Sequence, residues 1–173
     1  MLFEDSRHDR LTGLGNRRRL DEDLERLTDL SRRYDHQLAV VLFDVDRFKQ
    51  YNDTAGHAAG DEVLRSVAAA LAEQCRGGDS AYRYGGEELL VAFPEQNLQN
   101  GTIAAERMRA TVEALGIPHP GITPPGVVTV SGGVACLEPD ETVASLLNRA
   151  DAALYRAKRD GRNRIVGAPV GVT

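Results

Sequence analysis

Two adjacent glutamates, Glu87 and Glu88, follow a pair of glycines between two apolar, aromatic-rich segments. Gly85 and Gly86 predict a tight hairpin turn, because glycine accepts a positive φ without a Cβ clash, so the glutamates would leave the turn side by side. Like charges at the mouth of a buried strand are most easily explained by a cation. The alternative interpretation is a solvated hairpin tip with two surface acids.

A second acidic position favours the cation. The apolar segment 38–43 has the length of a central strand and is followed by Asp44, Val45 and Asp46. If this strand lies beside the hairpin, Asp44 meets the two glutamates at one end of the sheet. Clustered carboxylates without Cys or His nearby suit a hard ion such as Mg²⁺, which leaves coordination positions for substrate phosphates. Either aspartate could instead cap the turn after the strand.

Candidate phosphate-binding cations flank these acids. Lys49 lies five positions after Asp44, and Lys158 and Arg162 bracket the glycine that ends the last helical pattern. Lysine supplies a point charge and arginine a planar fork, and both suit a triphosphate. Each of these residues taken singly is more often a solvated surface cation.

Candidate base-binding residues lie between these cations. The glycine-punctuated stretch 52–62 opens an amphipathic pattern that predicts a helix at about 61–75, with Asp61 near its N-terminus. Capping is the ordinary role for Asp61, and turn formation is the ordinary role for Asn52. A carboxylate can also accept hydrogen bonds from the N1–H and exocyclic amine of guanine, and an amide can serve its other edge groups.

The ordered set of motifs resembles a GGDEF-type diguanylate cyclase domain, with Gly-Gly-Glu-Glu-Leu at 85–89 as the signature. The matching segments are Asp-Arg-Leu-Thr-Gly-Leu-Gly-Asn-Arg-Arg at 9–18, Phe-Asp-Val-Asp-Arg-Phe-Lys at 43–49, the polar positions of 52–61, and Ala-Asp-Ala-Ala-Leu-Tyr-Arg-Ala-Lys with Gly-Arg-Asn in 150–163. Leu89 stands where the family usually has Phe, a core exchange expected to alter packing more than chemistry. The resemblance implies a domain at 9–166, with 1–8 as the remnant of a linker from a sensory region missing from this chain and 167–173 as a flexible tail.

The resemblance implies condensation of two GTP molecules into cyclic di-GMP and two pyrophosphates, by two-metal phosphoryl transfer at a homodimer interface. It implies that Mg²⁺, or alternatively Mn²⁺, is bound by Asp44, the Val45 carbonyl, Glu87 and Glu88, and that the two glutamates are also catalytic. It implies that Asn52 and Asp61 bind guanine. The phosphates would be bound by Lys49, Lys158 and Arg162. Glu87 is the better candidate to help deprotonate the attacking hydroxyl. His57 lies near the same nucleotide, or is a loop histidine satisfied by its neighbours.

A second group of residues, Arg76 to Asp79, lies just upstream of the glycine pair. Arginine and aspartate three positions apart around two glycines ordinarily form a surface turn with a weak ion pair. The resemblance implies a product-binding inhibitory site. In such a site the arginine binds a phosphate and a guanine of the product, and the aspartate accepts hydrogen bonds from guanine. Arg107 matches a secondary arginine that a neighbouring domain contributes to that site.

The composition fits one cytoplasmic domain. The chain has 173 residues, of which 42% are hydrophobic and 27% charged, enough for a core of useful size. A net charge of −5 argues against nucleic acid or an anionic membrane as a general partner. Cys75 and Cys136 have no metal or redox spacing and are expected to be reduced. The apolar runs are too short to span a membrane, and the acidic N-terminus is no signal peptide.

The spacing of apolar residues along the chain predicts the helices and strands that position these residues. Helices are expected at about 20–34, 61–75, 103–115 and 143–157, and Asn16 is the expected N-cap of the first. Strands are expected at 38–44, 127–136 and 164–166, with a hairpin at 81–93 and a loop at 118–125. The order predicts an α+β, ferredoxin-like fold of the nucleotide-cyclase or palm type, with a mostly antiparallel central sheet flanked by helices. Two rival functions share these features: a degenerate module that only binds GTP or cyclic di-GMP, and a palm-like polymerase or mononucleotide cyclase.

Overall fold

Strand β1 (Leu38–Val45) is the centre of the fold, because its apolar run is buried along its whole length. In the computed structural model, which describes residues 6–171, β1 pairs antiparallel with β3 (Glu88–Pro94) on one side and β6 (Val130–Cys136) on the other. The edges are β2 (Ser80–Arg83), antiparallel to β3, and β7 (Ile165–Gly167), parallel to β6. The order β2-β3-β1-β6-β7 confirms the mostly antiparallel, ferredoxin-like sheet.

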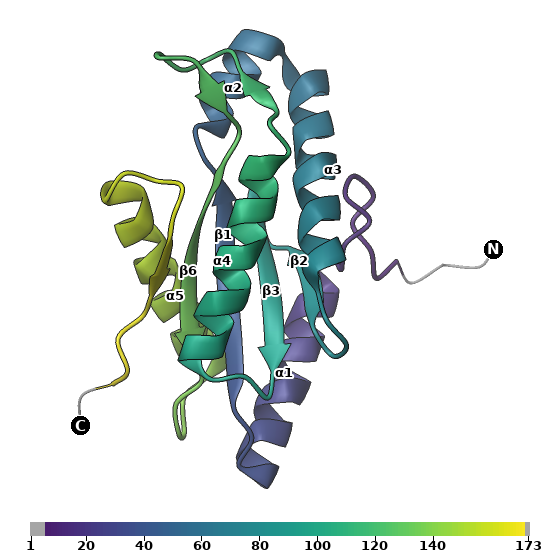
Figure 1. The fold of residues 1–173 in the computed structure, drawn as a ribbon. Helices are drawn as coiled ribbons and strands as arrows, with labels where there is room; N and C mark the ends of the chain where they lie inside the picture. Colours follow the sequence, from purple (N-terminus) through teal and green to yellow (C-terminus); the bar gives the residue numbers. More distant parts are fainter. Residues whose placement is uncertain (1–5, 172–173) are drawn as a thin grey trace, which may run out of the picture.

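Helices cover both faces of this sheet (Figure 1). Helices α3 (His57–Gln74) and α4 (Leu98–Ala114) pack on one face, and α1 (Arg17–Tyr34) and α5 (Val143–Arg159) pack on the other. The short helix α2 (Phe48–Ala55) follows the carboxyl end of β1 and leads into α3. Each helix in the described part of the chain is too short or too polar to cross a membrane.

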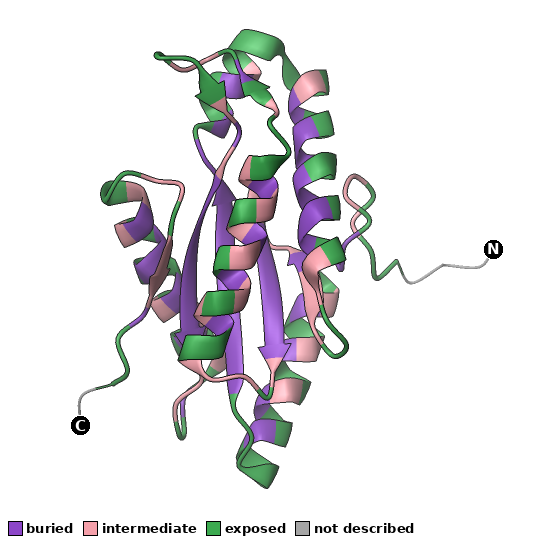
Figure 2. Cartoon of the chain, in the orientation of Figure 1, coloured by how far each residue is buried: buried purple, intermediate pink, exposed green. Residues whose placement is uncertain are grey.

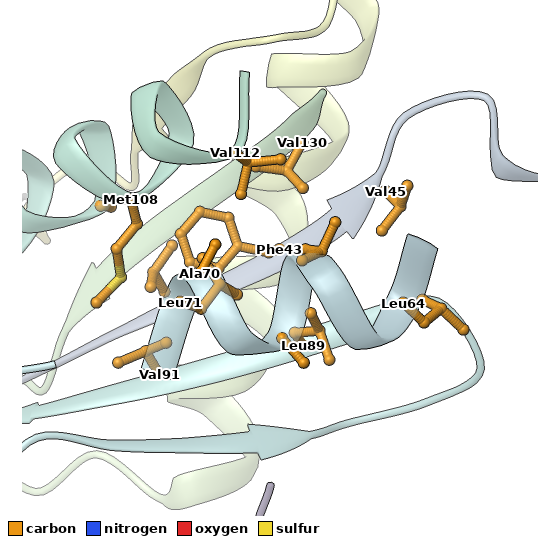
Figure 3. Packing of buried hydrophobic residues seen from close by; sticks show 14 of the residues in the cluster. Phe43, Val45, Leu64, Ala70, Leu71, Leu89, Val91, Met108, Val112 and Val130 are labelled. Carbon is orange, nitrogen blue, oxygen red and sulfur yellow. The ribbon is translucent and has the colours of Figure 1, made fainter. Parts of the chain in front are cut away.

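Alternation along β1 divides the core into two layers. Ala39, Val41 and Phe43 face α3 and α4, whereas Val40 and Leu42 face α1 and α5. Figure 2 shows the buried residues along the sheet and the inner faces of the helices. Figure 3 shows the Phe43 ring among the side chains of α3, α4 and β3, including Leu71, Met108 and Leu89. Leu89 is therefore a core residue, as predicted.

Polar side chains cap the helices that frame the sheet. Asn16 accepts a hydrogen bond from the backbone N–H of Arg19, which confirms the predicted N-cap of α1. Asn97 and Thr142 cap α4 and α5 in the same way. Helix α4 therefore begins at Leu98, before the position expected from its apolar residues, because the cap and not the first buried residue fixes a helix start.

Helix α3 also begins earlier than predicted, at His57 instead of 61. Gly56, with φ of 91°, ends α2 and starts α3 without a capping side chain, so the sequence carries no cap signal at the true start. Gly60 lies inside the helix and is buried against α2, where a Cβ would meet the Asn52 side chain. Gly60 therefore allows close packing of α2 against α3, whereas Gly56 supplies the positive φ between the two helices.

Three further boundaries differ from the prediction. The expected loop at 118–125 contains β4 (Pro118–His119), which pairs with β5 (Gly126–Val127). The tail begins later than 167, because Ala168 is buried and its N–H donates to the Val134 carbonyl at 2.6 Å. The predicted linker overlaps the fold at His8, which bridges to Gly15. Residues 1–5 and 172–173 of the linker and tail lie outside the described residues.

Candidate active site

The three acids predicted to meet do lie together at the carboxyl end of β1. Asp44 is opposite Glu88 in the β1–β3 ladder, and the backbone N–H of Val45 donates to the Glu87 carbonyl at 3.2 Å. Asp44 is buried, whereas Glu87 and Glu88 are half-buried. Strand register therefore fixes the acidic cluster, defined here as Asp44, Glu87 and Glu88, independently of any bound ion.

The turn that carries the glutamates differs from the predicted hairpin. Neither Gly85 nor Gly86 has a positive φ. Strand β2 ends at Arg83 and β3 begins at Glu88, and the backbone N–H groups of Tyr84 and Gly85 both donate to the Glu88 carbonyl, at 2.8 and 3.1 Å. A Cβ at Gly85 would lie 3.2 Å from the Glu88 carboxylate, so this glycine leaves room for that group.

The acidic cluster carries more negative charge than the protein neutralises. Lys158 on α5 donates to Asp44 at 2.5 Å, but it faces three carboxyl groups. Burial, the Asp44 charge and a hydrogen bond with Asp44 raise the pKa of Glu87 to about 7, against the opposing effect of Lys158. Burial and the Asp44 charge also raise the pKa of Glu88.

A divalent cation fits this donor set. Burial is the main cause of both raised pKa values, and an ion bound by the carboxylate oxygens would remove the repulsion that adds to it. Within residues 6–171, no three His, Cys, Asp or Glu side chains form a closed metal-binding group. Binding therefore requires the acidic cluster to gather around the ion, with further oxygens supplied by the ligand.

The three predicted phosphate-binding cations share one small cavity with Asp44 and Glu87. It has a volume of about 160 Å³ and is lined by Asp44, Val45, Asp46, Arg47, Phe48, Lys49, Gln50, Glu87, Lys158 and Arg162. Ligand pockets for whole small molecules are typically about 300 Å³ or more, so this cavity suits one end of a ligand. Lys49 from α2, Lys158 from α5 and Arg162 from the turn after α5 give that end a cationic lining.

The predicted base-binding residues lie on the adjoining corner of α2 and α3. Asn52 is half-buried, and its side-chain oxygen is buried without a hydrogen-bond partner among the described residues. His57 is the exposed first residue of α3. Asp61 is exposed in the second turn of α3, so it is not the cap of that helix, which was the alternative interpretation of this residue. None of the three lines the 160 Å³ cavity.

Asp46 has a structural role that separates it from Asp44. Its carboxylate accepts hydrogen bonds from the Thr129 and Ser131 hydroxyls, at 2.7 and 2.6 Å, and from the Asn163 N–H at 3.0 Å. Asn163 and the preceding Arg162 both have positive φ, of 47° and 64°. Asp46 thereby anchors the segment that presents Arg162 to the cavity, which goes beyond the local cap considered from the sequence.

Arg83 is a further residue that sequence reasoning missed. It donates to the carbonyls of Gly85 and Gly86, at 3.2 and 2.8 Å, and forms an ion pair with Asp9 at 3.2 Å. Asp9 in turn accepts from the Thr12 N–H and hydroxyl. One guanidinium therefore connects the N-terminal loop to the turn bearing the glutamates. The position of Asp9 in the first motif was the only signal for this contact.

The predicted inhibitory residues gather at the C-terminal end of α3. The Arg76 N–H donates to the Asp79 side chain at 2.9 Å, and the Asp79 N–H donates to the Arg76 carbonyl at 2.9 Å. Arg107 on α4 donates to the side chain and carbonyl of Gln74, at 3.1 and 3.2 Å. Burial and the nearby Asp79 raise the pKa of Cys75 to about 11 against the effect of Arg107, so this free thiol is protonated at neutral pH.

The sheet order and the acidic cluster at its central strand define a palm-like α+β domain. The chain belongs to the diguanylate cyclase GGDEF domain family, whose model matches residues 6–164. This confirms the resemblance seen in the motifs.

Solved and curated relatives agree. The GGDEF domain of DgcB from Caulobacter crescentus, in a crystal structure with c-di-GMP, has a TM-score of 0.90, is 36% identical, and is matched over 98% of this chain and 97% of its own. Diguanylate cyclase DgcP of Pseudomonas aeruginosa is 41% identical over 91% of this chain, and VdcA of Vibrio cholerae is 37% identical over 94%. The chain spans only 23% and 47% of the lengths of these two relatives.

Proposed function

We propose that this domain condenses two GTP molecules into cyclic di-GMP with release of two pyrophosphates. The observation that carries the proposal is the convergence of the acidic cluster with Lys49, Lys158 and Arg162 at the end of β1. Family membership supports it, as does the diguanylate cyclase activity named for DgcP and VdcA. The intact acidic cluster disfavours a degenerate module that only binds nucleotide.

The acidic cluster and the Val45 carbonyl would hold Mg²⁺, or Mn²⁺, because all are oxygen donors. Metal dependence is general in this family. When bound, the ions polarise the α-phosphate and stabilise the departing oxygen. The 3′-hydroxyl of one GTP attacks the α-phosphorus of the other as pyrophosphate leaves. Glu87 is the better candidate to help deprotonate that hydroxyl, because its half-buried carboxyl group lines the cavity beside Asp44.

The cations and the α2–α3 corner would bind the rest of GTP. Lys158 can exchange its bond to Asp44 for one to a phosphate once an ion neutralises the carboxylates. Lys49 and Arg162 complete the phosphate contacts. The unpaired oxygen of Asn52 is buried against Gly60, and it supports a role in base recognition because a guanine amine would supply the missing donor once the side chain rotates outward. Asp61 reads the same base, and His57 lies near the nucleotide.

The stoichiometry calls for a homodimer. One chain binds one GTP and so contributes half of an active site. The product contains two phosphodiester bonds between two nucleotides, so two GTP-loaded chains must face each other. The partners of the domain are therefore GTP, cyclic di-GMP and a second copy of itself, in the cytoplasm where GTP is available. The proposal includes neither nucleic acid nor direct membrane contact.

Product feedback would act through Arg76, Asp79 and Arg107. Arg76 is exposed and can reorient toward a phosphate, while the Asp79 carboxylate is a guanine acceptor. The structure of DgcB with c-di-GMP supports a binding role for the product in this family. Arg107 is held near this turn by Gln74 of its own chain, so a rotation of its side chain would be needed to reach the product.

The test is to incubate the domain with GTP and Mg²⁺ and to identify the products by mass spectrometry over a range of protein concentrations. We expect cyclic di-GMP and pyrophosphate, with activity per chain rising with concentration. Bound GTP with no product would favour the binding module. A linear or mononucleotide cyclic product would favour a polymerase-like or mononucleotide cyclase activity.

A further inference from the structure

His119 on β4 is buried against α2, although the proposed chemistry does not use it. The residue is 3% exposed. Its ring lies edge-on to the ring of Tyr51 on α2, with centroids 5.2 Å apart and an interplanar angle of 87°. The short β4–β5 hairpin thus brings a polar ring under the helix that carries Lys49 and Asn52.

Both ring nitrogens of His119 have defined partners. The Gly121 N–H donates to Nδ1 at 3.1 Å, and the Arg47 carbonyl lies 3.0 Å from Nε2. A backbone N–H can only donate and a carbonyl can only accept, so Nδ1 is bare and Nε2 carries the hydrogen. His119 therefore donates to the carbonyl at the start of α2 and accepts from its own loop.

The residue that His119 holds is in an unfavourable conformation. Arg47 precedes α2 with φ of 52° and ψ of 39°, and no side chain caps the helix there. The left-handed conformation is unfavourable for a non-glycine residue, so it persists only where neighbouring contacts fix it. The Arg47 carbonyl is fixed by His119 and by the Tyr51 N–H, which donates to it at 3.1 Å.

The same loop also contacts α2 directly. A Cβ at Gly121 would lie 2.5 Å from the Gln50 carbonyl, so the backbone of the loop is seated against the helix. Arg47, Lys49 and Gln50 line the cavity that contains Asp44. The position of α2 relative to the acidic cluster thus depends on the segment that carries His119 and Gly121.

We propose that His119 is a positioning residue for GTP: through the Arg47 carbonyl it fixes α2 so that Lys49 and Asn52 meet the nucleotide. This inference rests on the proposed function. His119 touches neither the ligand nor the reacting atoms in this account. Loss of the His119 side chain should therefore lower the affinity for GTP and the preference for guanine over adenine more than it slows the chemical step.

The main test replaces His119 by leucine, which keeps the bulk and removes both hydrogen bonds. Affinity is measured with 3′-deoxy-GTP, which lacks the attacking hydroxyl, and with 3′-deoxy-ATP; kcat and KM are measured with GTP. For His119→Leu we expect Kd and KM to rise about tenfold, kcat to change less than about threefold, and the preference for guanine to fall about tenfold. His119→Gln restores a donor near Nε2 and should remain within about threefold of the wild type.

Two further variants separate positioning from stability. His36→Leu is the matched control, because His36 is an exposed histidine on the loop between α1 and β1, and it should leave Kd and selectivity unchanged. Gly121→Ala disturbs the same contact without touching His119, so it should reproduce the loss of affinity and selectivity even if His119→Leu does not fold. Thermal melting followed by circular dichroism confirms that each variant is folded.

Unchanged Kd and base preference in folded His119→Leu or folded Gly121→Ala would overturn the inference. So would a loss confined to kcat, or no recovery with glutamine. If the wild type binds 3′-deoxy-GTP but forms no cyclic di-GMP, the proposed function fails while the affinity data still decide the role of His119. A wild type that binds neither nucleotide analogue would overturn both.

Discussion

Asp44, Glu87 and Glu88 bring three carboxyl groups to the end of β1, and Lys158 offsets only part of their charge. Burial and this crowding raise the pKa of Glu87 from 4.5 to about 7. A carboxyl group with a raised pKa binds its proton more tightly in the folded chain than in the unfolded one. Its contribution to stability is therefore greatest below pH 4.5 and is lost as the pH rises toward 7.

Replacing Glu87 by glutamine should make the ion-free protein more stable at pH 8, because the variant has no buried charge to accommodate. We expect a gain on the order of 1 kcal/mol in the free energy of unfolding, after allowance for solvent screening, and little difference at pH 4.5. Urea unfolding at both pH values in a chelator is the measurement. Glu73→Gln, at an exposed site on α3, is the control. A variant less stable than the wild type at pH 8 would contradict the assigned cause of the raised pKa.

Gly60 offers a second test at the residue scale. Alanine in a helix interior is ordinarily more stabilising than glycine by about 0.5–1 kcal/mol, but a Cβ here would meet the flexible Asn52 side chain. Gly60→Ala should therefore fold with unchanged or slightly raised stability, yet show a several-fold higher KM for GTP and a weaker preference over ATP. Steady-state kinetics with both nucleotides provide the measurement, with the exposed Ser66→Ala on the same helix as control. Wild-type selectivity in Gly60→Ala would argue against Asn52 as a base reader.

At the scale of elements, the two aspartates that end β1 serve different partners. Both line the cavity, but Asp44 pairs with Lys158, whereas Asp46 accepts three hydrogen bonds that join the end of β1 to β6 and to the segment after α5. The sequence alone offered capping as an interpretation for both. Alternation does not separate them, because residues two positions apart share a face of a sheet. The difference comes from their neighbours: Asp44 lies within β1 and meets Lys158, whereas Asp46 lies one residue past the end of β1 and meets Thr129, Ser131 and Asn163.

Asp46→Asn should destabilise the fold by about 1–3 kcal/mol, because an amide nitrogen would face hydroxyl or N–H donors. Asp44→Asn should cost less stability, since its ion-pair partner, Lys158, is partly exposed and can hydrate. Chemical denaturation of both variants gives the comparison. Equal stability of the two would show that the Asp46 contacts are not the anchor of the 160–164 segment.

Local patterns predicted most of the elements. The continuous apolar run gave β1, and the leucine spacing with Asn16 gave α1, because both signals lie within one element. The start of α3 was missed because Gly56 begins it without a capping side chain. The roles of Asp46, Arg83 and His119 were also missed, because their partners are distant in sequence and only the folded sheet brings them together.

At the scale of the whole molecule, α3 separates two proposed functions. Asn52 and His57 lie at its N-terminal end, and Arg76 and Asp79 follow its C-terminal end. Eighteen helical residues span about 27 Å, so a product bound at the second end lies a helix length away from the base-binding corner at the first. Feedback at that distance would have to act through the arrangement of the two chains.

Cyclic di-GMP should therefore inhibit the wild type without competing with GTP. Arg76→Ala should lower the inhibitory potency of cyclic di-GMP by at least about tenfold and keep the initial rate, because Arg76 makes no contact with the acidic cluster. Initial rates at several concentrations of GTP and product are the measurement. Arg65→Ala, an exposed arginine in mid-helix, is the control. Inhibition that GTP relieves competitively, or that survives in Arg76→Ala, would leave the 76–79 segment as a surface turn.

The most direct test of the account compares cyclic di-GMP formation by the wild type and by Glu87→Gln at the same protein concentration. The substitution removes one carboxylate without loss of volume, and circular dichroism establishes that both proteins are folded. We expect the wild type to convert GTP to cyclic di-GMP in the presence of Mg²⁺ and Glu87→Gln to be slower by at least about a thousandfold. Near-normal product formation by Glu87→Gln would contradict the claim that the acidic cluster at the end of β1 performs the chemistry.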